Sequence, residues 1–199
     1  MPTIRIDPTK FRQLDLRCHA LLSDVPLNDV WAVPLTGGGA GRTMKDVRGL
    51  MQGRRRRRSN MAVDALFWLR WRLGRVFKWD DDRHDDPAAS YVHRLTELDC
   101  LRSEVPPGTR EGAFRVLYVF PHEAVSEIRN ATVHGFLVLA LTRRVQGYEL
   151  YIGVYVKPVS WLTGVYMAVI DPFRRFIVYP ALGRQVQQAW LRTFSRARA

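Results

Sequence analysis

His134 is the residue of this sequence best suited to acid–base chemistry. It lies in a strongly apolar stretch, residues 132–142, and an imidazole exchanges a proton near neutral pH. A hydrogen-bonded structural histidine is the commoner occupant of such a stretch, so His134 is a weak catalytic candidate. The sequence has no nucleophile elbow and no His-Glu-x-x-His motif. We therefore expect a protein without a cofactor and without enzymatic activity; the alternative is an enzyme for a small apolar substrate, with His134 as acid–base.

Residues 37–41 read Gly-Gly-Gly-Ala-Gly and precede an expected helix. Backbone amides at the start of a helix can hold a phosphate group. The stretch lacks the Gly-Lys-Ser/Thr ending of a P-loop, which favours a flexible strand-to-helix connection over a phosphate site.

A run of five arginines is followed by an expected helix, residues 63–78, that carries tryptophans on its basic face. Basic residues interleaved with tryptophan are typical of a helix at an anionic membrane surface. Such contacts would come from Arg54, Arg55, Arg56, Arg57, Arg58, Trp68 and Trp71. A solvated loop before an ordinary packed helix is the alternative. No nucleic-acid-binding module is recognised, so we do not expect nucleic acid as a partner.

The sequence indicates no metal site. Residues 80–86 contain five aspartates and His84, but their spacing matches no EF-hand, and a solvated acidic turn is the favoured interpretation. Cys18 and Cys100 have no second ligand at metal-binding spacing, and isolated thiols fit a reducing compartment. Asp171, beside Pro172, is expected to make a structural ion pair at a helix break.

The totals are those of one globular domain. The 199 residues are 47% hydrophobic and carry a net charge of +12, which suits an anionic partner as well as simple solubility. The N-terminus lacks the apolar segment of a signal peptide, so we expect a cytoplasmic protein that is either free or associated with a membrane surface.

The apolar pattern predicts an α+β fold in which strands and helices segregate. Residues 1–28 are weakly patterned, with a short helix expected around 11–22. A first strand is expected at 30–33, followed by two helices at about 43–53 and 61–78. Further strands are expected at 91–98, 114–120, 123–129, 132–142 and 148–157, the last two forming a hairpin whose two faces are both apolar.

A long helix is expected from residue 161 towards the C-terminus, bent or interrupted at Pro172 and Pro180. Its apolar run is broken by charges well before the roughly 20 residues of a membrane span. We therefore expect this helix to lie against the sheet.

Three stretches, residues 69–77, 130–134 and 166–180, carry a family resemblance. Over residues 29–190 the chain resembles an uncharacterised bacterial family, some of whose members are joined to NmrA-like Rossmann reductases; the Rossmann glycine motif is absent here. That family is similar to the START and polyketide-cyclase superfamily. The resemblance implies a helix-grip fold: a curved antiparallel sheet wrapped around a long C-terminal helix, with a pocket between them. It transfers no catalytic residue.

In a helix-grip fold, aromatic residues of the strands and of the last helix would line the pocket. The candidates, with plain core packing as the alternative for each, are Tyr118, His134, Phe136, Tyr151, Tyr155 and Tyr166. We therefore expect a protein that binds an apolar small molecule or lipid, of an oligomeric state that the sequence leaves open.

Overall fold

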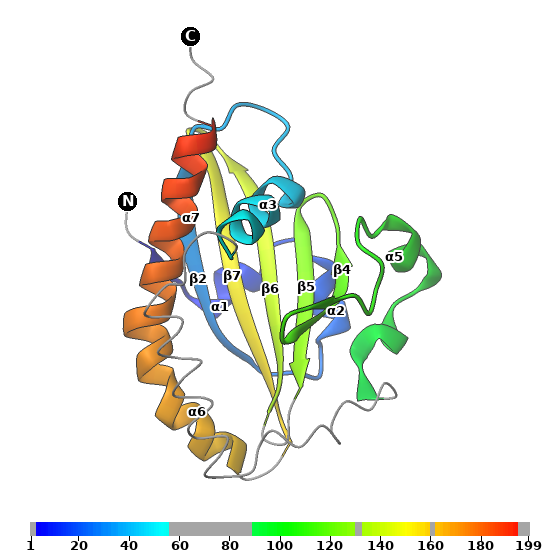
Figure 1. Ribbon diagram of the computed structural model, residues 1–199. Helices are drawn as coiled ribbons and strands as arrows, with labels where there is room; N and C mark the ends of the chain where they lie inside the picture. The colour runs from blue at the N-terminus through cyan, green and yellow to red at the C-terminus, as the bar shows by residue number, and fades with distance from the viewer. Residues whose placement is uncertain (1–2, 56–88, 130–132, 160–161, 195–199) are drawn as a thin grey trace.

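The fold is built on a seven-stranded antiparallel sheet with the order β1-β2-β7-β6-β5-β4-β3 (Figure 1). The computed structural model describes residues 3–55, 89–129, 133–159 and 162–194. The strands are β1 (Ile4–Arg5), β2 (Leu27–Thr36), β3 (Arg110–Glu111), β4 (Phe114–Val119), β5 (Glu123–Arg129), β6 (Val133–Arg144) and β7 (Gly147–Pro158). The expected α+β class, with antiparallel strands and a long C-terminal helix, is confirmed.

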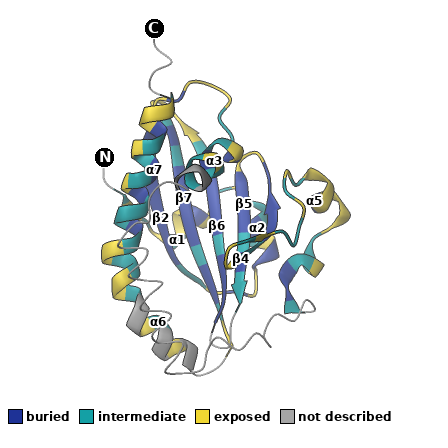
Figure 2. Ribbon diagram, viewed as in Figure 1, coloured by how far each residue is buried: buried dark blue, intermediate teal, exposed yellow. Residues whose placement is uncertain are grey.

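The hairpin of β6 and β7 forms the centre of the sheet. Both strands are rich in β-branched and aromatic residues, which favour a pleated, buried conformation. They pair in unbroken register from Val133 opposite Pro158 to Arg144 opposite Gly147. Figure 2 shows these strands as buried along most of their length. Because successive side chains point to opposite faces of the sheet, each of the two apolar faces must be packed against other elements of the fold.

The first face is covered by the helices α3 (Met44–Arg55) and α7 (Tyr179–Phe194). Its core contains Trp31, Val33, Leu139, Leu150 and Ile152, with Trp190 from the helix.

The second face is covered by α1 (Pro8–Arg12), α2 (Arg17–Leu21) and the turn η3 (Tyr91–Arg94). Phe11, Leu21, Val30, Val138 and Tyr155 are buried there. The sheet is thus the middle of three layers, as the two-sided hairpin predicted.

The C-terminal helix runs from α6 (Leu162–Phe173) through the π-helical turn η4 (Arg174–Val178) into α7. Pro172 removes a backbone donor inside α6, and the wider π turn follows it directly. The helix is therefore irregular where the sequence predicted a bend, but it continues past Pro180.

The expected strand at residues 91–98 is wrong. This segment forms η3 and then the start of α5 (Glu97–Arg102), whose N-terminus is held by a capping box between Thr96 and Asp99. The apparent alternation there was outweighed by this local capping. The short helix expected around residues 11–22 is divided into α1 and α2. The helix expected at 61–78 lies outside the described residues.

Candidate functional site

A groove of about 850 Å³ opens at the end of the sheet where three segments meet. It is lined by residues 36–40 at the end of β2 and beyond it, by residues 143–147 at the β6–β7 turn, and by Leu191 and Phe194 of α7. The antiparallel pairing of β2 with β7 sets Thr36 opposite Gly147, which brings the first two segments together.

The glycine loop, residues 37–41, is held in place through its carbonyl groups. The Arg42 Nε donates to the carbonyl oxygen of Gly38 at 2.6 Å, and the Tyr148 hydroxyl donates to that of Gly39 at 3.1 Å. Among the described residues, the last four amides of the loop have no hydrogen-bond acceptor. The four glycines have φ between 72° and 97°, a region that L side chains rarely adopt. The loop therefore offers backbone donors that no acceptor in the described part of the chain occupies.

Arg143 adds a cation to the same groove. Its side chain is exposed, and no carboxylate of the described chain pairs with it. The neighbouring Arg144 is engaged, because it binds Glu149 at 2.5 Å and also reaches the Tyr151 hydroxyl. Arg143 also lines a second cavity of about 310 Å³, beside His122 and Tyr148. It is the cation best placed to meet a ligand in either cavity.

The opposite wall of the groove is apolar. Leu191 is exposed at 45%, and the ring of Phe194 lies under the Arg42 guanidinium at 4.0 Å. Beneath this wall, the fully buried Trp190 packs against Gly38 and donates its Nε1–H to the carbonyl oxygen of Thr36 at 3.2 Å. The last turns of α7 thereby fix the position of the glycine loop.

The groove can hold a negatively charged group against an apolar tail. Successive unpaired amides form an anion-binding concavity, and a nearby guanidinium strengthens the attraction. The volume lies within the roughly 300–1,000 Å³ of small-molecule sites. Sequence reasoning singled out the glycines but missed Arg143; a prediction that β2 pairs with β7 would have placed them side by side.

Gly147 should be essential to this geometry. Its φ is 139°, and an added Cβ would collide with the carbonyl oxygen of Leu35 and lie 2.7 Å from the Gly37 nitrogen. We expect Gly147→Ala to lower the free energy of unfolding by about 2 kcal/mol in urea titrations. The matched control is Gly49→Ala in α3, where nothing lies within 4 Å and alanine should stabilise by up to about 1 kcal/mol. Equal effects of the two changes would contradict this account.

His134 is buried and lines neither cavity. Its Nε2 lies 3.0 Å from the Glu127 carboxylate, and its ring packs on Phe136 at 4.4 Å. Burial favours the neutral acid, but hydrogen bonds from His134, Ser90 and the Tyr91 amide outweigh it and lower the pKa of Glu127. His134 is thus a buried, hydrogen-bonded histidine, and a catalytic role for it stays a prediction.

Five of the six proposed pocket residues share one face of the sheet. Tyr118, Phe136, Tyr151 and Tyr155 are buried in the core beneath α1 and α2, and His134 adjoins them. They therefore lie across the sheet from α7 and not beneath it, because side chains alternate between the two faces along each strand. Tyr166 is in α6, but its side chain lies outside the described part. The role of these residues as ligand contacts stays a prediction.

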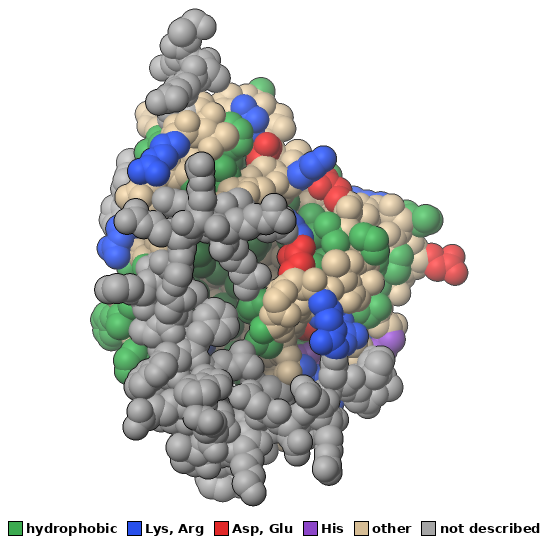
Figure 3. All heavy atoms as spheres, viewed as in Figure 1, with side chains coloured by type: hydrophobic (Ala, Val, Ile, Leu, Met, Phe, Trp, Pro, Cys, Tyr) green, Lys and Arg blue, Asp and Glu red, His purple; other side chains and the backbone are tan. Residues whose placement is uncertain are grey.

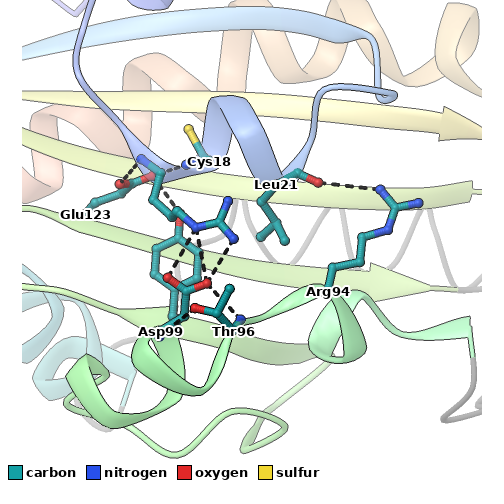
Figure 4. A network of polar contacts seen from close by, with 8 residues as sticks. Cys18, Leu21, Arg94, Thr96, Asp99 and Glu123 are labelled. Carbon is teal, nitrogen blue, oxygen red and sulfur yellow. Dashed lines mark hydrogen bonds and ion pairs between the residues drawn. The ribbon is translucent and has the colours of Figure 1, made fainter.

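A polar network fastens α2 to the sheet (Figure 4). Glu123 accepts hydrogen bonds from the amides of Arg17 and Cys18, at 2.9 and 2.8 Å, and from the Tyr118 hydroxyl at 2.7 Å. The Arg17 guanidinium binds both oxygens of Asp99. Burial, with further effect from Glu123, raises the pKa of the Cys18 thiol. All these groups are satisfied internally, so the network is structural.

The remaining predicted contacts are only partly described. Arg54 and Arg55 end α3, with side chains outside the described set, and Arg56, Arg57, Arg58, Trp68, Trp71 and the acidic turn 80–86 lie beyond it. Within the part of the chain that the structure describes, no cluster of His, Cys, Asp and Glu could hold a metal ion. None of the described helices has the length and apolar character to cross a membrane.

The fold and the groove define an α+β protein with a helix-covered antiparallel sheet and a polar–apolar cleft at one end. Residues 21–181 match the family described as "Protein of unknown function (DUF2867)", and the chain belongs to that family. No curated protein and no solved structure matches the chain. The resemblance to the START and polyketide-cyclase superfamily stays a prediction.

Proposed function

We propose that the protein binds a small amphiphilic anion, such as a fatty acid or an alkyl phosphate, in the groove at the glycine loop. One observation carries the proposal: the glycine loop and Arg143, neither of which has an anionic partner among the described residues, line the same groove as Leu191 and Phe194. An anionic head would replace water on the amides and the guanidinium, and the tail would cover the apolar wall.

This proposal keeps the expectation of a lipid-like ligand and moves its site. The ligand enters at the end of the sheet, where α7 finishes. His134 takes no part, since it lies in the core and lines neither described cavity.

Isothermal titration with three probes tests the proposal. Decyl phosphate carries both chemical features, decan-1-ol has only the tail, and inorganic phosphate has only the head. We expect decyl phosphate to bind most tightly, because the two walls of the groove act on one molecule. Equal affinity for decyl phosphate and decan-1-ol would exclude an anion site.

Arg143→Gln should weaken decyl phosphate binding about tenfold, because a charge-assisted hydrogen bond contributes roughly 1.5–3 kcal/mol. Binding of decan-1-ol should not change. The matched control is Arg5→Gln on β1, an exposed arginine away from the groove, which should leave both affinities unchanged. Equal losses in Arg143→Gln and Arg5→Gln would show that only net charge matters, and the proposed site would be abandoned.

A further inference from the structure

The outside of the C-terminal helix carries large apolar side chains in solvent. Phe176 is exposed at 79%, Ile177 at 43% and Phe173 at 41%, all close to the junction of α6 and α7. Figure 3 shows apolar side chains gathered at the left edge of the molecule, with basic side chains above them along the helix. Three such residues within five positions make a contiguous patch, and patches of this kind mark contact surfaces.

This patch lies on the face of the helix that is turned away from the sheet. The packed face is formed by Tyr179, Gly183, Val186 and Trp190, whose spacing of three or four residues is that of one helical side. Figure 2 shows exposed residues along the opposite side of the same helix. These apolar side chains therefore belong to neither of the two core clusters formed by the described residues.

The positive charge of the C-terminal helix indicates what kind of partner would suit the apolar patch. Residues 172–194 contain four arginines and neither aspartate nor glutamate. Arg174 is buried, Arg175 is paired with Asp171, and Arg184 and Arg192 are exposed. The apolar patch is thus followed along the helix by cations alone, within a chain of net charge +12. Aromatic and aliphatic residues beside arginines suit a helix that lies flat in the headgroup region of an anionic bilayer.

We propose that this outer helix face, formed by Phe173, Phe176, Ile177, Arg184 and Arg192, docks on an anionic lipid membrane. The apolar side chains enter the headgroup boundary, and the arginines contact lipid phosphates. A second copy of this chain is a poorer occupant, because a symmetric contact would set arginines against arginines on two cationic molecules.

Vesicle co-sedimentation of the full chain tests the proposal. We expect binding to vesicles of phosphatidylcholine mixed with phosphatidylglycerol, and much weaker binding to phosphatidylcholine alone. Phe173→Ser/Phe176→Ser should weaken binding to the mixed vesicles at least about tenfold, because each phenylalanine loses its favourable burial. Arg184→Gln and Arg192→Gln should each weaken it about fivefold.

The matched control is Leu98→Ser/Leu101→Ser in α5, which removes two exposed leucines from another part of the surface and should leave vesicle binding unchanged. Equal losses in both double variants would overturn the proposal. Analytical ultracentrifugation supplies the second readout. If the wild type is a dimer that Phe173→Ser/Phe176→Ser dissociates, and neither protein binds the mixed vesicles, the face is a subunit interface and the proposal fails.

Discussion

Asp29→Asn should lower the free energy of unfolding by about 3 kcal/mol. The Asp29 carboxylate is fully buried on β2, and an Nη atom of Arg174 lies 3.2 Å from it at the π-helical turn. Removing one partner of a buried ion pair leaves the other charge without compensation, which costs about 3–5 kcal/mol. The nearby Asp171, 3.5 Å from Arg174, should hold the loss at the lower end of that range.

The surroundings of the Asp29–Arg174 pair favour the charged form of Arg174 in the folded protein. Burial opposes the charge, but Tyr179 and the Asp29 carboxylate outweigh that effect and raise the pKa of the guanidinium. The Tyr179 hydroxyl accepts hydrogen bonds from Arg174, and its ring stacks on Trp31 at 4.9 Å between centroids. The pair therefore attaches the irregular part of the C-terminal helix to the edge of the sheet.

A double-mutant cycle in urea measures the coupling. The variant Asp29→Asn/Arg174→Met removes both charges and should be more stable than Asp29→Asn alone. Asp24→Asn is the control, because Asp24 and its partner Arg94 are both partly exposed and such pairs contribute about 1 kcal/mol or less. If the effects at Asp29 and Arg174 are simply additive, the buried pair has no energetic role.

Trp190→Ala should lower the free energy of unfolding by about 3–5 kcal/mol, as is usual for a buried aromatic side chain. Trp190 is fully buried between α7 and the sheet, with Tyr148 and Phe194 around it at centroid distances of 5.5 and 4.8 Å. It also supports Gly38, so its loss should release the glycine loop and weaken decyl phosphate binding at the same time.

Unfolding followed by circular dichroism checks this prediction. Trp190→Phe keeps most of the volume but loses the hydrogen bond to the Thr36 carbonyl, and we expect a loss of about 1–2 kcal/mol. Leu191→Ala, at the adjacent exposed position, should cost less than about 1 kcal/mol. A Trp190→Ala protein as stable as Leu191→Ala would contradict the proposed packing.

Elements with local signals could be predicted from the order of residues along the chain. Apolar, β-branched and aromatic content predicted the strands β4, β5, β6 and β7, and helical spacing predicted α3 and the C-terminal helix. Apolar residues on both faces of the β6–β7 hairpin predicted covers on both sides. These signals succeed because β-branched and aromatic side chains suit a pleated strand, and a period of 3.6 residues follows directly from helix geometry. The strand prediction for residues 91–98 failed because a short capping motif favours a helix there more strongly than the weak apolar alternation favours a strand.

Contacts between residues far apart in the chain became visible only in the folded arrangement. The strand register places Phe136 and Tyr155 on the face away from α7. A shift of the register by one residue would place both side chains on the opposite face. The pairing of β2 with β7 brought Arg143 to a loop about a hundred positions earlier in the chain. Asp29 and Arg174 are 145 residues apart and share no local pattern. The physical reason is that spacing along the chain encodes the faces of single elements, whereas the packing of those faces determines which side chains converge.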